Sequence, residues 1–131
     1  MRVLDTDTCI AILRGIQPVL LRRAAEEDEV ATTWITASEL FYGAAKSKAP
    51  AETRVEVLRF LTTLPVLDLD LTSVQLFGNA KAELIRLGRR IEDADLLIGA
   101  IAVARDAIVV TGNTRHFQRI PGVRLENWIL G

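Results

Sequence analysis

Four polar residues stand where the hydrophobic pattern predicts the end of a strand or the start of an apolar helix. Asp5 ends an apolar run at the N-terminus, and Asn113 follows the β-branched run 107–111. Glu39 and Asp95 lie early in two apolar helical stretches. In a parallel sheet, ligands bind beyond the carboxyl ends of the strands, and helices that start there add side chains to the same place. We therefore expect these four side chains to meet at one edge.

Carboxylates gathered at one edge repel one another and raise one another's pKa, and a divalent cation removes that penalty. The candidate ligands are oxygens, with no cluster of His or Cys, which favours Mg²⁺ or Mn²⁺ over zinc. The chemistry that such a site performs is metal-assisted hydrolysis of a phosphodiester.

Each acid also has a purely structural interpretation. Thr36 and Glu39 fit a T-x-x-E capping box, in which the Glu side chain bonds the N-cap amide. Asp93 or Asp95 is favoured in a first helical turn by the helix dipole. Asp5 and Asp7 are candidate caps of a helix beginning near Thr8, and Asn113 fits a turn.

Strands and helices are expected to alternate along the whole chain. The predicted strands are 1–5, 30–33, 65–69, 107–111 and a short one at 123–126, and the predicted helices are 8–14, 18–27, 36–47, 52–63, 71–87 and 93–105. This alternation is typical of an α/β domain with a mostly parallel, covered sheet of about five strands.

Composition agrees with one compact domain over residues 1–131, since 50% of the chain is hydrophobic. Cys9 is the only cysteine, so no internal disulfide can form, and it is expected to be a small buried hydrophobe. The first residues are charged, unlike a signal peptide, and the longest low-charge stretch is far short of the roughly 20 residues of a membrane span. We therefore expect a cytoplasmic protein without a membrane segment. A net charge of −1 argues against nucleic-acid binding through bulk charge and leaves a local basic patch open.

Four segments together resemble one known family. They are VLDTDT, ITASELFYGAAKS, DADLLIGAIAVA and VVTGNTRHFQRIPGVRLENW, in the order and spacing found in VapC-type toxins of the PIN-domain ribonucleases, from VapBC toxin–antitoxin systems. The resemblance implies a three-layer α/β/α domain with an acidic pocket that binds Mg²⁺ or Mn²⁺ and an endoribonuclease activity. It also implies a VapB-type antitoxin as partner.

The resemblance assigns roles to the acids. Asp5 and Asp95 match family acids that bind the metal, and Glu39 matches a third, which binds the metal or a water on it. The fourth family acid falls on Asn113, which would orient a water, and its missing charge argues against a second fully occupied metal site. Asp93 and Asp7 are candidate replacements, although Asp93 and Asp95 are two residues apart and should not face the same way on a helix.

Further residues are candidates for contacts with RNA. Thr6 and Thr111 are possible hydroxyl donors at the same edge, or respectively a neighbour of a helix cap and an ordinary strand residue. Basic residues near the acids would meet RNA phosphates, or be ordinary surface arginines: Arg89, Arg90, Arg115 and Arg119. His116 is expected at the surface rather than as a general base, and Trp128 is expected to pack near the last strand. Helices between Pro18 and Thr63 are expected to expose an apolar groove for the antitoxin, to complete the core or to form a homodimer.

Other functions fit less well. Asp5-Thr-Asp7 resembles the nucleophile motif of haloacid-dehalogenase phosphatases, but those require a later lysine and the last one here is Lys81. A response-regulator receiver fails for the same reason. The alternatives left open are a housekeeping PIN nuclease in RNA processing and a catalytically decayed PIN module that only binds RNA or a partner, for which Asn113 is the supporting feature.

Overall fold

The computed structural model describes residues 1–130 and shows a five-stranded parallel sheet. Its strands lie in the order β3-β2-β1-β4-β5, and every pairing is parallel. They are β1 (Arg2–Leu4), β2 (Val30–Thr33), β3 (Val66–Leu67), β4 (Ile108–Val110) and β5 (Arg124–Glu126). Because β1 is central, with β2 on one side and β4 on the other, the chain leaves β1 and β4 at neighbouring points of the carboxyl edge.

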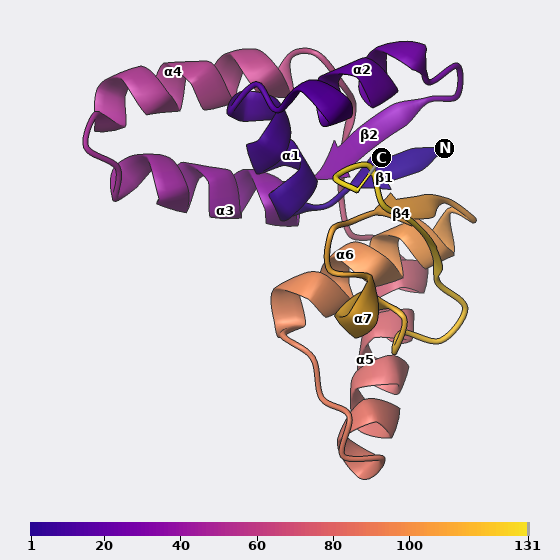
Figure 1. Ribbon diagram of the computed structural model, residues 1–131. Coiled ribbons are helices and arrows are strands. Elements are labelled where there is room, and N and C mark those ends of the chain that lie inside the picture. Colours follow the sequence, from indigo (N-terminus) through magenta and orange to yellow (C-terminus); the bar gives the residue numbers. More distant parts are fainter. Residues whose placement is uncertain (131) are drawn as a thin grey trace.

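Seven helices cover the described sheet on its two faces (Figure 1). They are α1 (Thr6–Leu13), α2 (Gln17–Ala25), α3 (Trp34–Ala45), α4 (Pro50–Leu61), α5 (Leu71–Arg86), α6 (Asp93–Ala104) and α7 (Thr114–Phe117). Helices α1 to α4 lie on one side, where α3 and α4 form a hairpin that extends away from the sheet, and α5 to α7 lie on the other. The predicted three-layer α/β/α architecture is confirmed.

The sheet separates two hydrophobic cores. Successive residues of a strand face opposite sides, so Val3 packs with residues of α5 and α6 such as Leu84 and Ile98, whereas Leu4 packs with residues of α1 to α4. Trp128 is 1% exposed and joins the second core, as predicted. The two cores hold the sheet rigid between its helix layers, so the residues at its carboxyl edge have fixed positions.

Helices α1, α3 and α4 each begin two residues earlier than predicted, and α7 was missed. Helix α1 begins at Thr6 because Asp5, not a later residue, caps it. Helix α3 begins at Trp34 because the hydroxyl of Thr33 accepts a hydrogen bond from the amide of Thr36. Helix α7 has only four residues, too few to show a helical period.

No helix among residues 1–130 combines the length and the apolar character needed to cross a membrane.

Candidate active site

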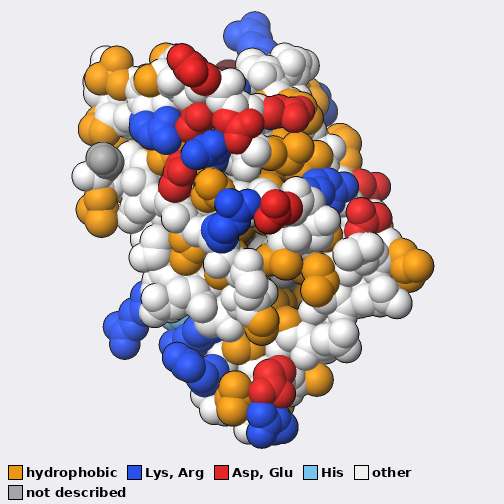
Figure 2. All heavy atoms as spheres, turned by 90° about the vertical axis from the view of Figure 1, so that its right-hand side faces the viewer, with side chains coloured by type: hydrophobic (Ala, Val, Ile, Leu, Met, Phe, Trp, Pro, Cys, Tyr) orange, Lys and Arg blue, Asp and Glu red, His pale blue; other side chains and the backbone are white. Residues whose placement is uncertain are grey.

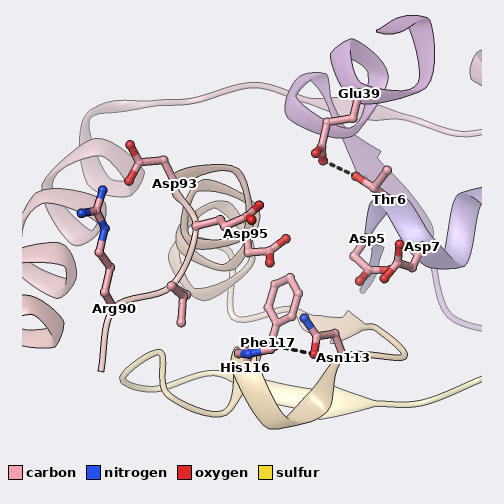
Figure 3. A pocket seen from close by; sticks show the side chains of 12 residues that line it. Asp5, Thr6, Asp7, Glu39, Arg90, Asp93, Asp95, Asn113, His116 and Phe117 are labelled. Atoms are coloured by element: carbon pink, nitrogen blue, oxygen red, sulfur yellow. Dashed lines mark hydrogen bonds between the residues drawn. The ribbon is translucent and has the colours of Figure 1, made fainter. Parts of the chain in front are cut away.

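An open cavity of about 700 Å³ lies at the carboxyl edge of β1 and β4 (Figure 3). All four predicted polar residues line it, each from a different part of the chain. Asp5 follows β1, Glu39 lies on α3, Asp95 lies on α6, and Asn113 follows β4. Its lining residues are Asp5, Thr6, Asp7, Glu39, Arg90, Ile91, Glu92, Asp93, Asp95, Asn113, His116 and Phe117. The predicted meeting of the four polar side chains at one sheet edge is therefore what the structure shows.

Asp5 is both a helix cap and a cavity residue. Its Oδ1 accepts a hydrogen bond of 2.9 Å from the amide of Thr8, and the side chain is only 3% exposed. Burial raises the pKa of Asp5 above its ordinary value, while hydrogen bonds from Thr111 and Thr8 act to lower it. The structural and functional interpretations of Asp5 are thus compatible, since a carboxylate has a second oxygen left for a ligand.

Glu39 is free of the capping role that the T-x-x-E pattern allowed. Thr33 caps α3, which places Glu39 in the second turn, beyond the reach of the cap amide. Its Oε1 instead accepts a hydrogen bond of 2.5 Å from the hydroxyl of Thr6, whose oxygen also lies 3.2 Å from that of Thr36. The capping-box interpretation was wrong, and Thr6 holds the Glu39 carboxylate at the side of the cavity (Figure 3).

Asp95 carries the clearest electrostatic signature in the cavity. Burial, and after it the negative charges of Asp5 and Glu39, together raise its pKa to about 6. Asp93 differs, as its two-residue spacing from Asp95 predicted, because it is exposed and forms an ion pair of 3.0 Å with Lys81. In Figure 3, Asp95 points toward the middle of the cavity, whereas Asp93 lies toward its Arg90 side.

Asn113 and His116 form a pair at the opposite wall. The amide oxygen of Asn113 lies 2.7 Å from Nδ1 of His116, and its backbone amide donates to the hydroxyl of Thr111 over 2.8 Å. His116 is exposed, as predicted, yet it also lines the cavity. Thr111 itself is fully buried and acts through Asp5 and Asn113 rather than by lining the cavity.

The predicted arginines differ in their closeness to the acids. Arg90 lines the cavity, and its carbonyl oxygen accepts a hydrogen bond of 3.2 Å from the guanidinium of Arg119. Arg89 and Arg115 are exposed and lie outside the lining residues. Sequence reasoning missed Glu92, which lines the cavity beside Asp93, although its place before the apolar helix was a usable signal.

The donor set suits a hard divalent cation, since it consists of carboxylate and amide oxygens. Within residues 1–130, however, no three acidic, histidine or cysteine side chains are grouped closely enough to enclose an ion. Thr6 holds Glu39, and Thr8 holds one oxygen of Asp5. The acids face one cavity without forming a preassembled metal cage.

Almost the whole chain matches one known family. The PIN domain sequence profile matches residues 2–123. The tRNA(fMet)-specific endonuclease VapC of Salmonella typhimurium is 38% identical over 128 residues, covering 96% of both chains. Ribonuclease VapC2 of Haemophilus influenzae is 35% identical, covering 97% of both chains.

Solved structures agree with the sequence matches. The chain aligns with one from DNA-bound VapBC of Salmonella typhimurium at a TM-score of 0.91 and 38% identity, with 97% of both chains covered. VapBC2 of Rickettsia felis, bound to a DNA fragment from its promoter, gives a TM-score of 0.88 at 32% identity, covering 97% of this chain and 98% of that one. The chain therefore belongs to the PIN-domain family, and within it to the VapC group of the VapBC toxin–antitoxin systems.

Proposed function

We propose that this chain is a Mg²⁺- or Mn²⁺-dependent endoribonuclease that hydrolyses RNA phosphodiester bonds as the toxin of a toxin–antitoxin pair. The observation that carries the proposal is the cavity at the carboxyl edge, where Asp5, Glu39 and Asp95 arrive from three separate elements. A fold that needed these acids only as caps would not have to bring them into one open cavity. We also propose that the protein is located in the cytoplasm, because its RNA substrate is found there.

The residues that would hold the metal are Asp5 and Asp95, with Glu39 as a direct ligand or as a partner of a water on it. When bound, the ion supplies positive charge that lets these acids stay ionised together and polarises the phosphodiester. Thr6 holds the carboxylate of Glu39 in position. Asp93 is a poorer candidate ligand, because Lys81 already neutralises it.

Beside the acids, Arg90 offers positive charge for RNA. Figure 2 shows a different side of the molecule, where the strands begin, and there basic side chains gather toward the lower end. Acidic and basic side chains mix over the upper part of that face. We assign Arg90 to a phosphate next to the acids, and Arg89 and Arg115 to phosphates farther along the strand.

A second cavity of about 560 Å³ lies between α1, α3 and α4 and supports a VapB-type antitoxin as partner. Its apolar walls include Ile10, Leu13 and Tyr42, and the Tyr42 side chain is 66% exposed. It shares Thr6, Asp7 and Glu39 with the acidic cavity, so a segment lying in it would reach the acids. We also propose a homodimer, supported by exposed apolar side chains on α4 such as Val55 and Leu58.

The test is cleavage of a labelled total-RNA pool by the purified protein with Mg²⁺, with Mn²⁺ and with EDTA. Asp5→Asn and Asp95→Asn are the matched variants, and circular dichroism confirms that they fold. We expect cleavage that needs metal and disappears in both variants. Absence of cleavage by the folded wild-type protein with every metal would reject the nuclease and favour a decayed module that binds RNA or a partner.

A further inference from the structure

The wall of the acidic cavity formed by Asn113 differs chemically from the rest. The acids offer only oxygens to a ligand, but an asparagine side chain has one acceptor oxygen and two N–H donors. The orientation of this amide decides whether the fourth position binds a cation or an anion. A cation requires the oxygen to face the cavity, and an anion requires the N–H group.

His116 sets that orientation. It lies three residues after Asn113, one turn along α7, and its backbone amide bonds the Asn113 carbonyl over 3.2 Å. This helical turn brings the ring beside the amide, where Nδ1 lies 2.7 Å from the amide oxygen. An oxygen at that distance accepts a hydrogen from Nδ1, which turns the oxygen toward His116 and the nitrogen of the amide into the cavity (Figure 3).

We propose that Asn113 donates a hydrogen bond to a phosphate oxygen of the RNA rather than binding the metal, and that His116 is the positioning residue that turns its amide toward the substrate. This inference rests on the proposed nuclease function. An N–H donor cannot bind a cation, but phosphate oxygens accept hydrogen bonds from such groups. In a cavity walled by acids, the Asn113 donor and Arg90 are the groups that attract the anionic substrate.

The first test needs no activity. His116 is the only histidine of the chain, so one imidazole appears in a long-range ¹H–¹⁵N correlation spectrum. At about pH 8.5, where a free imidazole is neutral, we expect the Nδ1–H tautomer, with Nε2 unprotonated. The Nε2–H tautomer would make Nδ1 an acceptor of the Asn113 amide, turn the oxygen toward the cavity and overturn the proposal.

The second test separates substrate from metal. The probe is a short fluorescent single-stranded RNA of random sequence, and Mn²⁺ binding is measured separately by calorimetry. We expect Asn113→Ala to raise the KM for this RNA about ten-fold, as for loss of a hydrogen bond to a charged group, and to leave Mn²⁺ affinity unchanged. Weakened Mn²⁺ binding with an unchanged KM would overturn the proposal, because the amide oxygen would then be a metal ligand.

His116 variants test the positioning role. His116→Leu removes the donor to the amide oxygen and should raise the KM in the same direction as Asn113→Ala, whereas His116→Gln keeps an N–H donor and should restore it. Equal KM values for the Leu and Gln variants would overturn the role of His116. If the wild-type protein neither binds nor cuts the RNA, the nuclease proposal fails and the phosphate contact with it; if it does both and Asn113→Ala has no effect, only the present inference fails.

Discussion

Thr6, the first residue of α1, donates a hydrogen bond of 2.5 Å to Glu39, in the second turn of α3. The two residues are 33 positions apart in the chain, and Thr6 directly follows the buried Asp5. The bond therefore links the acid after β1 to the acid on α3 and fixes how far the Glu39 carboxylate lies from the other acids. Thr6, which is uncharged, thus controls the position of the charged Glu39 carboxylate.

Removing the Thr6 hydroxyl should weaken metal binding. Thr6→Val keeps the shape of the side chain but leaves Glu39 without its partner, and we expect Mn²⁺ affinity to fall several-fold while stability drops by about 1 kcal/mol, the net value of one hydrogen bond. Calorimetric titration and urea unfolding measure the two effects. Thr6→Ser keeps the hydroxyl and is the control. Affinity in Thr6→Val equal to that of the wild type would show that Glu39 does not depend on Thr6.

Asp95→Asn should stabilise the metal-free protein. The pKa of Asp95 is about 6 in the folded protein against an ordinary value of 3.8, so the ionised side chain disfavours folding. The penalty is absent below the ordinary pKa, grows as pH rises, and is complete above about pH 6. After discounting for solvent screening, the gain at neutral pH is about 1 kcal/mol.

Asp93→Asn is the matched control for Asp95→Asn. It makes the same change of charge two residues away, but Asp93 is exposed and paired with Lys81, so its removal should bring no gain. Urea unfolding in EDTA at neutral pH and at about pH 4 measures both variants. A stabilisation that is equal for the two, or that persists at acidic pH, would mean that general charge reduction and not the cavity is the cause.

The general plan of the fold follows from sequence periodicity. Alternating strand and helix patterns predicted the parallel sheet, and the apolar runs ending at Asp5 and before Asn113 predicted which residues reach its carboxyl edge. Strands β1 and β4 are neighbours, so both residues line the same cavity. This part could be predicted because burial on both faces of a sheet leaves an unambiguous apolar pattern.

The details of the site could not be predicted in the same way. Thr33-x-x-Thr36 and Thr36-x-x-Glu39 both fit an N-terminal cap, and only the end of β2 at Thr33 decides between them. The ion pair of Lys81 with Asp93 joins two helices, so no local spacing announces it. Helix α7 has four residues, barely more than one helical turn, so no periodicity predicts it or the contact of His116 with Asn113.

Variants of Asp5 can separate its role as the cap of α1 from its proposed role at the metal site. Asn is as good an N-cap as Asp and removes a charge that burial disfavours, so Asp5→Asn should at least keep the stability of the protein in EDTA. It should lose the stabilisation by Mg²⁺ or Mn²⁺. Asp5→Ala should lose both, with a further cost of about 1 kcal/mol from the missing hydrogen bond to Thr8. Melting temperatures with EDTA and with each metal measure these effects. Metal stabilisation that survives in Asp5→Asn would remove Asp5 from the metal site.

A variant in the second cavity, the groove between α1, α3 and α4, should weaken antitoxin binding without affecting RNA cleavage. Tyr42 is 66% exposed and lines that groove but not the acidic cavity. A carboxylate in its place would lose its water when an apolar partner segment covers it, so Tyr42→Asp should weaken binding about ten-fold or more. The measurement uses a VapB-type antitoxin that is co-expressed and purified with this chain.

Leu71→Asp is the control for Tyr42→Asp, because Leu71 is 72% exposed and begins α5, outside the groove. Both variants should cut RNA as the wild type does when free, since neither residue lines the acidic cavity. Only Tyr42→Asp should escape inhibition when the antitoxin is added. Equal inhibition of the two variants would place the antitoxin elsewhere on the surface, and escape by Leu71→Asp alone would move it to α5.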